Sequence, residues 1–154
     1  MNEYKTEPQT GDGPVFTFFN EVGIINQLST AMLAQVLPDG VHPSHFAIVN
    51  HLFRVGNGWP PARIAAAMQV TKTTMSHSLK VLEDKGLIQI APNPDDGRAK
   101  QVFLTDRGRV FRGQAILKAQ KKFRDVLRPE DVEAMTRCLK DLQSVRRRLD
   151  EMRG

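Results

Sequence analysis

The chain has 154 residues, 40% of them hydrophobic and 25% charged, which suits one globular domain that buries its own core. A single cysteine excludes an intramolecular disulfide, no apolar run approaches the roughly 20 residues that span a bilayer, and the first residues hold no hydrophobic secretory segment, so we expect a cytoplasmic protein without a membrane partner. The net charge of +5, with its largest basic excess after residue 105, suits a polyanionic partner such as nucleic acid.

The N-terminal third predicts a tail and then two helices. Residues 1–14 are polar and contain proline and glycine, and we expect a mobile tail there. From residue 15 to residue 37, apolar side chains recur at helical spacing over a wide face, which must be covered on more than one side. A second helix is expected over residues 43–55, capped by His42 or Ser44. Its inward residues are expected to be Phe46, Val49, Leu52 and Phe53.

Three histidines around this second helix, His42, His45 and His51, raise the alternative of a metal site. The spacing of His42 and His45 could supply two ligands, but no CxxC motif or carboxylate cluster completes a set. Capping and core hydrogen bonds explain these residues better, and we expect neither a metal nor another cofactor.

The functional interpretation depends on residues 59–105. Pro60 and Pro61 fit the start of a short helix, because the N–H groups that they lack would have no partner there. A break at residues 69–70 is followed by Thr71, a good N-cap for a second helix. Two helices joined by a tight turn are typical of the helix-turn-helix motif.

The helix that follows Thr71 has two different faces. Met75, Leu79 and Leu82 share one face and are expected to be buried, and Gly86 is expected to end the helix. The opposite face is polar and rich in hydrogen-bond donors, which suits reading of the major groove, although an ordinary solvated face has the same composition. The candidate DNA-binding residues of this helix are Lys72, Thr73, Thr74, Ser76, His77 and Lys80.

Two short strands are expected next, at residues 87–90 and 101–104, since both runs are rich in large or β-branched apolar residues. Prolines and a glycine exclude a helix from residues 91–100, which are expected to form the exposed loop of a hairpin. A hairpin that carries Arg98 and Lys100 near its tip, placed after a helix-turn-helix, predicts a winged helix.

This stretch resembles the signature of the MarR family of bacterial transcriptional regulators. The resemblance rests on Asp96-x-Arg98 followed after five residues by Leu104-Thr105, and on Leu82-Glu83-x-x-Gly86-Leu87 before it. It implies a homodimer on a pseudo-palindromic operator in double-stranded DNA, which represses transcription and is released by a small aromatic or phenolic ligand. It also implies that Arg98 and Lys100 contact phosphate or the minor groove, with Asp96 supporting Arg98.

The chain departs from the family pattern at three positions. Ile90 stands where the family often has an arginine, Arg63 where an acidic residue is common, and His45 where a glutamine is frequent. The missing arginine removes one backbone contact or wing ion pair from the expected set, and none of the three changes alters the expected fold.

Two long helices are expected to end the chain, one from residue 106 towards residue 127 and one after Arg128-Pro129. In the second, apolar residues alternate at spacings of three and four for about three heptads. The winged helix-turn-helix region cannot cover these apolar faces alone, so we expect two copies of the chain to bury them against each other. The alternative is that the helices pack on one another within one chain. Cys138, beside this seam, is expected to be a buried structural thiol. The residues assigned to dimerisation are Val15, Phe18, Phe19, Val132, Met135, Leu139, Leu142 and Leu149.

We therefore predict a mainly α fold with a small β-hairpin, in which residues 15–152 form one domain. A winged helix-turn-helix lobe occupies residues 43–105, and dimerisation helices occupy residues 15–37 and 106–152. The predicted function is sequence-specific DNA binding by a transcriptional regulator, and no enzyme is expected because phosphate loops, nucleophile elbows and HExxH motifs are absent. The alternative is a winged-helix protein–protein interaction module, which would need neither Arg98 nor the polar helix face.

Overall fold

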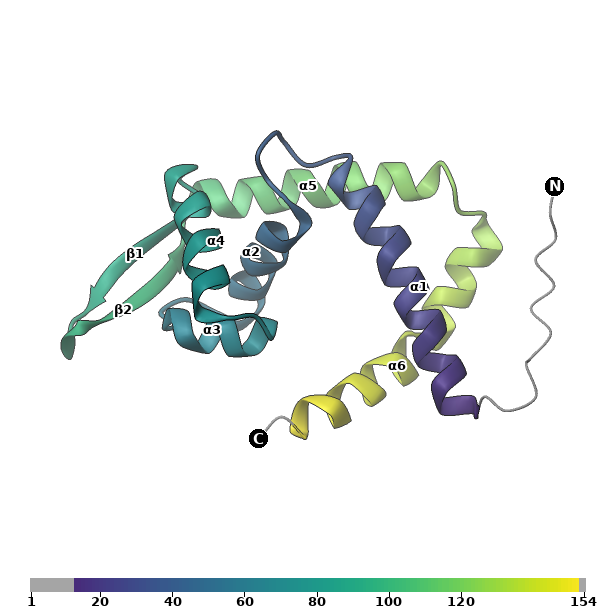
Figure 1. Ribbon diagram of the computed structural model, residues 1–154. Helices are drawn as coiled ribbons and strands as arrows, with labels where there is room; N and C mark the ends of the chain where they lie inside the picture. The colour runs from purple at the N-terminus through teal and green to yellow at the C-terminus, as the bar shows by residue number, and fades with distance from the viewer. Residues whose placement is uncertain (1–12, 153–154) are drawn as a thin grey trace. The chain divides into compact units, whose positions relative to one another are not determined.

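The computed structural model describes residues 13–152 (Figure 1). Within that range the chain forms six helices and one antiparallel hairpin, which confirms the predicted fold class. None of these helices is long and apolar enough to cross a membrane. The elements are α1 (Pro14–Ala34), α2 (Pro43–Val55), α3 (Pro61–Met68), α4 (Lys72–Asp84), β1 (Ile88–Asn93), β2 (Asp96–Leu104), α5 (Asp106–Arg124) and α6 (Pro129–Glu151).

The chain divides into two compact units, one that ends at Ile116 and one that begins at Leu117. The first holds α1 to β2 and the start of α5, and the second holds the end of α5 and all of α6. The mobile tail predicted for residues 1–14 lies outside the described residues, apart from Gly13, which is the N-cap of α1, and Pro14, which begins it.

The core of the first unit lies between α2, α3, α4 and the hairpin. The three residues predicted to face inward from α4, Met75, Leu79 and Leu82, are 1%, 2% and 0% exposed. They confirm that the apolar residues of α4 recur with the period of a buried helical face. The buried apolar residues of this core are Ile48, Val49, Leu52, Ile64, Ala65, Met75, Leu79, Leu82, Leu87, Ile88, Val102 and Leu104.

The prediction that Phe53 faces inward is wrong. Its side chain is 45% exposed, because the buried stripe of α2 runs through Ile48 and Leu52 and leaves Phe53 at the rim. There its ring lies under the guanidinium of Arg112, whose Cζ is 3.9 Å from the ring centroid, and Arg112 Nε donates to Asn50 Oδ1 at 2.9 Å. Phe53 therefore helps to hold the start of α5 against α2 at the surface.

The turn between α3 and α4 is as tight as predicted. Gln69 takes the left-handed conformation, with φ 54°, directly after α3. The Thr71 hydroxyl then accepts the backbone N–H of Thr74 at 3.1 Å, which confirms Thr71 as the N-cap of α4. At the other end Gly86, with φ 69°, donates its N–H to the carbonyl oxygen of Glu83 at 2.8 Å and lets the chain leave the helix.

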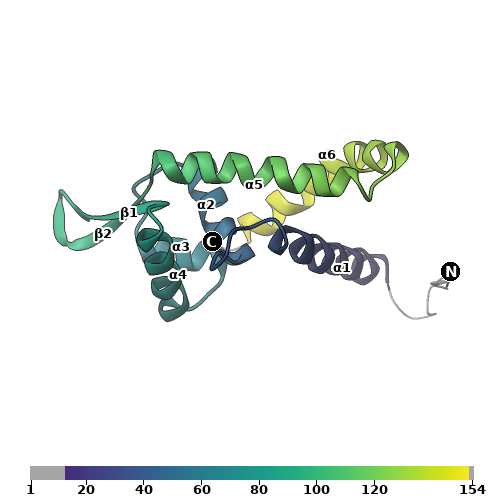
Figure 2. The ribbon, with the colours of Figure 1, turned by 90° about the horizontal axis from the view of Figure 1, so that it is seen from above.

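The hairpin has longer strands than predicted, and it projects away from α2, α3 and α4 in both views (Figures 1 and 2). The strands pair regularly from Ile88–Leu104 to Pro92–Lys100, and the chain reverses at residues 94–95. Residues 91–100 are therefore mainly strand, because an edge strand tolerates a proline whose missing N–H would point outward. The register shifts after Pro92, which leaves residues 97–99 bulging from β2.

The segment before α3 pairs with the second edge of β2. The Val102 N–H donates to the Trp59 carbonyl oxygen at 2.9 Å, and the Gly58 N–H donates to the Val102 carbonyl oxygen at 3.0 Å. Both backbone groups of Val102 thus point away from β1. In an antiparallel ladder its direct partner Ile90 must then turn its own N–H away from β2.

Two helices end earlier than predicted. α1 stops at Ala34 instead of residue 37, and α5 stops at Arg124 instead of residue 127. After each helix the backbone tightens into a turn of the 3₁₀ type, in which the Val36 N–H donates to the Leu33 carbonyl oxygen and the Val126 N–H donates to the Phe123 carbonyl oxygen.

The prediction that Cys138 is buried is wrong for the single chain. Its side chain is exposed, and its Sγ donates to the Met135 carbonyl oxygen at 3.3 Å. The reason is that α6 has no buried residue. The large exposed apolar residues of α6 and of its C-cap are Val132, Met135, Leu139, Leu142, Val145, Leu149 and Met152.

α1 likewise has no buried residue. Its large exposed apolar residues are Val15, Phe16, Phe18, Phe19, Ile24, Ile25 and Leu28. Apolar surfaces of this extent are typical of interaction sites in soluble proteins.

The predicted capping role of the histidines is confirmed at the start of α2. His45 Nδ1 accepts the backbone N–H of His42 at 3.1 Å, and the two residues form a capping box. His51 is buried, with its ring edge-on to Trp59 at 4.9 Å between centroids. In the part of the chain that the structure describes, no group of three His, Cys, Asp or Glu side chains could hold a metal ion.

Burial of the His45 ring lowers its pKa below the ordinary value of 6.5, and the nearby His42, His77 and Lys85 lower it further. Between the lowered pKa and about pH 6.5 the unfolded chain therefore binds more protons than the folded chain. We expect the free energy of unfolding to be highest above about pH 6.5 and to decrease as the pH falls through the pKa of folded His45. Urea unfolding at a series of pH values measures this, and His45→Gln, which keeps an acceptor but does not titrate, should flatten the curve.

Candidate nucleic-acid interface

The outward face of α4 carries the predicted recognition residues. Thr73, Ser76, His77 and Lys80 are all exposed, on the side of the helix opposite its buried residues. Because the first turn of α4 leaves backbone N–H groups without helical partners, this end of the helix also favours a phosphate. The face thus offers uncharged donors and acceptors for base edges beside positive groups for phosphates.

Two of the predicted residues of α4 already have partners. The Thr74 hydroxyl lies 2.9 Å from the hydroxyl of Thr71, so it belongs to the N-cap. Lys80 Nζ lies 3.3 Å from Asp84, and both side chains are largely exposed. An exposed ion pair of this kind contributes roughly 0–1 kcal/mol, so Lys80 can exchange Asp84 for a phosphate at little cost.

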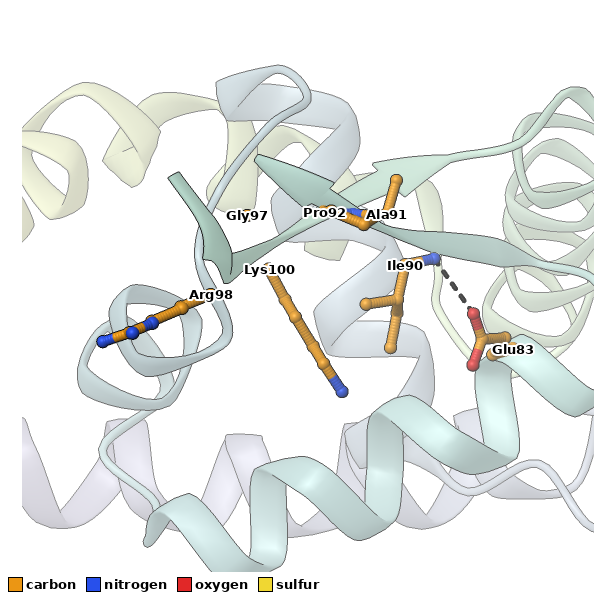
Figure 3. A pocket seen from close by; sticks show the side chains of 7 residues that line it. All are labelled: Glu83, Ile90, Ala91, Pro92, Gly97, Arg98 and Lys100. Atoms are coloured by element: carbon orange, nitrogen blue, oxygen red, sulfur yellow. Dashed lines mark hydrogen bonds between the residues drawn. The ribbon is translucent and has the colours of Figure 1, made fainter. Parts of the chain in front are cut away.

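The wing places its basic residues on the side of the hairpin that faces α4. Directly opposed residues of two strands share a face, so Lys100 shares one with Pro92, in line with Ile90 and Val102. Ile90 and Lys100 point the same way in Figure 3, and Ala91 points the opposite way. A hollow of about 210 Å³ separates this side of the hairpin from the end of α4. Its lining residues are Glu83, Ile90, Ala91, Pro92, Gly97, Arg98 and Lys100.

Asp96 acts on the backbone of the wing. Its Oδ1 accepts the N–H of Arg98 at 3.0 Å, and across the turn Asn93 Oδ1 accepts the N–H of Asp95 at 3.0 Å. Short side chains that bond the backbone two residues ahead stabilise turns. Asp96 therefore shapes the bulge from which Arg98 projects, while the exposed guanidinium of Arg98 is left to meet a ligand.

Sequence reasoning missed one residue of this region. Glu83 lies in the last turn of α4, and its Oε1 accepts the backbone N–H of Ile90 in β1 at 3.0 Å (Figure 3). The signal was present in the Leu82-Glu83 pair of the family pattern, but nothing in the spacing says that a glutamate reaches a strand seven residues later.

Residues 39–99, which run from the turn before α2 through most of the wing, match the model of the MarR family. This stretch of the chain is therefore similar to the MarR family, in agreement with the resemblance found in the sequence. The match covers the helix-turn-helix and most of the wing, which are the elements that carry the predicted DNA-binding residues. A comparison with curated protein sequences found no match.

Solved structures share this MarR fold over nearly their whole length. A transcriptional regulator from Thermotoga maritima is 24% identical, with a TM-score of 0.65 over 88% of this chain and 97% of its own. A mutant of MarR from E. coli, complexed with operator DNA, is 20% identical, with a TM-score of 0.59 over 83% and 94%. BpsR of Bordetella bronchiseptica, whose DNA binding is regulated by 6-hydroxynicotinic acid, is 19% identical, with a TM-score of 0.62 over 82% and 98%.

Proposed function

We propose that the protein is a cytoplasmic homodimeric repressor that occupies a pseudo-palindromic operator and is released by a small aromatic ligand. The observation that carries the proposal is that one lobe combines an exposed polar face on α4 with a wing that bears exposed Arg98 and Lys100. Two such lobes related by a twofold axis would place their α4 helices in successive major grooves, roughly 10 base pairs apart. The E. coli MarR mutant complexed with operator DNA supports this mode of binding.

The dimer is supported by the apolar faces of α1 and α6, which remain exposed to water in a single chain. A closed twofold dimer is the commonest way to bury such a face. The small-molecule part of the proposal is supported by BpsR, whose DNA binding responds to an aromatic acid. Phe18, Phe19, Phe46 and Trp59 are aromatic residues of the first unit that could line a ligand site.

Replacing Thr73 and Ser76 together by alanine should erode discrimination between a selected duplex and random DNA. Neither side chain is charged, so non-specific binding should be almost unchanged, while the selected duplex should lose roughly 1–3 kcal/mol of binding free energy. The measurement is a competition titration with a duplex of about 30 base pairs selected from a random pool, which holds two half-sites. If the affinities for the selected duplex and for random DNA fall in parallel, Thr73 and Ser76 do not read the bases, and another surface must do so.

Replacing Arg98 by alanine should weaken DNA binding by roughly 1–3 kcal/mol per half-site and change thermal stability by only a few tenths of a kcal/mol. A phosphate contact predicts the same loss on every sequence and a flatter dependence of affinity on salt, whereas a minor-groove contact predicts a larger loss on A·T-flanked duplexes. Titrations at two salt concentrations separate these outcomes.

Lys118→Ala is the control for Arg98→Ala, since it removes one exposed positive charge from α5, outside the winged helix-turn-helix lobe. It should leave the affinity nearly unchanged. If neither variant alters binding to any duplex, the wing has no part in DNA recognition. If the wild-type protein shows no salt-dependent binding at all, the protein-interaction alternative replaces the proposed function.

A further inference from the structure

Glu83 joins the recognition helix to the wing. Its Oε1 accepts the Ile90 N–H at 3.0 Å, and among the described residues no other side-chain hydrogen bond connects α4 to the hairpin (Figure 3). The donor is one that the sheet itself cannot satisfy: both backbone groups of Val102 serve the Trp59 segment, so the N–H of Ile90 points out from the edge of β1. A carboxylate is a strong acceptor for such an N–H group.

Packing alone does not fix the angle of the wing. Ile88 is buried and Ile90 is half-buried, so the base of the hairpin is anchored in the core. Beyond Ile90, however, the hollow of about 210 Å³ lies along the hairpin, and Glu83 is the one residue of α4 among those that line it. Lys100 lies two residues past Val102, roughly 7 Å further out, and Arg98 lies beyond it in the bulge. A rotation of the hairpin about its base is therefore magnified at both basic residues.

We propose that Glu83 is a positioning residue for DNA binding, which sets the angle between wing and recognition helix by holding the Ile90 N–H. It thereby fixes where Arg98 and Lys100 meet the DNA relative to the bases that α4 reads. Glu83 itself touches no DNA in this arrangement, because its negative charge would repel a phosphate. The inference rests on the proposed function and adds a residue that acts through the wing.

Two substitutions of Glu83 separate its geometry from its charge. Glu83→Ala removes the acceptor, and we expect it to weaken binding of the selected duplex roughly tenfold. Glu83→Gln removes the charge but keeps an oxygen that can accept the Ile90 N–H, and we expect it to stay within about threefold of wild type. Circular dichroism and thermal unfolding of the full-length variants establish that both are folded.

Double-mutant cycles show through which element Glu83 acts. Arg98→Ala should cost up to roughly tenfold less in the Glu83→Ala background than in the wild-type background, because a wing that has lost its angle no longer uses Arg98 fully and the coupling cannot exceed the loss that Glu83→Ala itself causes. The matched cycle combines Glu83→Ala with the alanine pair at Thr73 and Ser76. There the losses should multiply, since the recognition face does not depend on the wing.

Coupling to Arg98 without coupling to Thr73 and Ser76 supports the proposal. Equal coupling to both sets would overturn it, because Glu83 would then act on α4 as a whole. If Glu83→Ala binds like wild type while Arg98→Ala is impaired, the positioning role is wrong and the proposed function stands. Failure of Arg98→Ala to weaken any complex removes the wing from the proposed function and the role of Glu83 with it.

Discussion

A protein in which Leu139 and Leu142 are both replaced by glutamate is expected to be a monomer with little affinity for its operator. Both leucines lie on the exposed apolar face of α6, 49% and 40% exposed in the single chain. If that face is buried between two copies, each dimer would have to bury four carboxylates without partners, which costs far more than the apolar contacts stabilise. Each monomer then binds one half-site, and losing the linked second module lowers the affinity roughly 10²- to 10⁴-fold.

Light scattering and a titration with the selected duplex test this expectation together. The matched control is Lys140→Gln with Ser144→Glu, which makes the same change in net charge on the opposite side of the same helix, where both residues are exposed. The control should remain a dimer and bind DNA with nearly the wild-type affinity. A dimeric Leu139→Glu, Leu142→Glu protein would place the dimer interface elsewhere.

Gly108→Ala should lower the free energy of unfolding by roughly 1–3 kcal/mol or more. Gly108 is in the first turn of α5, beside the backbone of Leu87. A methyl group there would overlap the carbonyl oxygen of Leu87 and lie 2.7 Å from Leu104 Cδ1. The first of these atoms belongs to the backbone between α4 and β1, so relief of the overlap requires a shift of the whole start of α5.

Gly113→Ala in the same helix is the control, because no atom lies within 4 Å of a methyl group at that position. It should raise the free energy of unfolding by roughly 0.5–1 kcal/mol, since alanine loses less backbone entropy than glycine in a helix. Chemical denaturation of the two variants should therefore show changes of opposite sign in the free energy of unfolding. Two changes of the same sign would show that the close approach of Gly108 to Leu87 does not limit stability.

The recognition helix is the part that could be predicted most completely. Its three large inward residues recur with the helical period, and Thr71 and Gly86 mark its ends by local chemistry that needs no tertiary contact. The winged helix-turn-helix lobe around this helix could be predicted for the same reason. What periodicity could not show is where a buried stripe ends: Phe53 satisfies the spacing and still lies at the rim, under Arg112.

The remaining differences depend on contacts between distant segments. The strands extend past Pro92 because β1 is an edge strand, and local propensity does not reveal which strand lies at an edge. The Glu83–Ile90 hydrogen bond depends on the direction in which the hairpin leaves α4, which no spacing rule contains. The burial expected for Cys138 depends on a face of α6 that one chain leaves exposed.

The regular pairing of the hairpin from Ile88–Leu104 to Pro92–Lys100 also limits how this wing can change in evolution. Adding one residue to each strand would turn Lys100 to the opposite face, away from α4, whereas adding two to each strand would restore the face and lengthen the hairpin by roughly 7 Å. Insertions and deletions should therefore persist in lineages mainly when they lengthen or shorten both strands by an even step. The reach of the wing along a duplex would then differ between descendants of this gene in discrete increments.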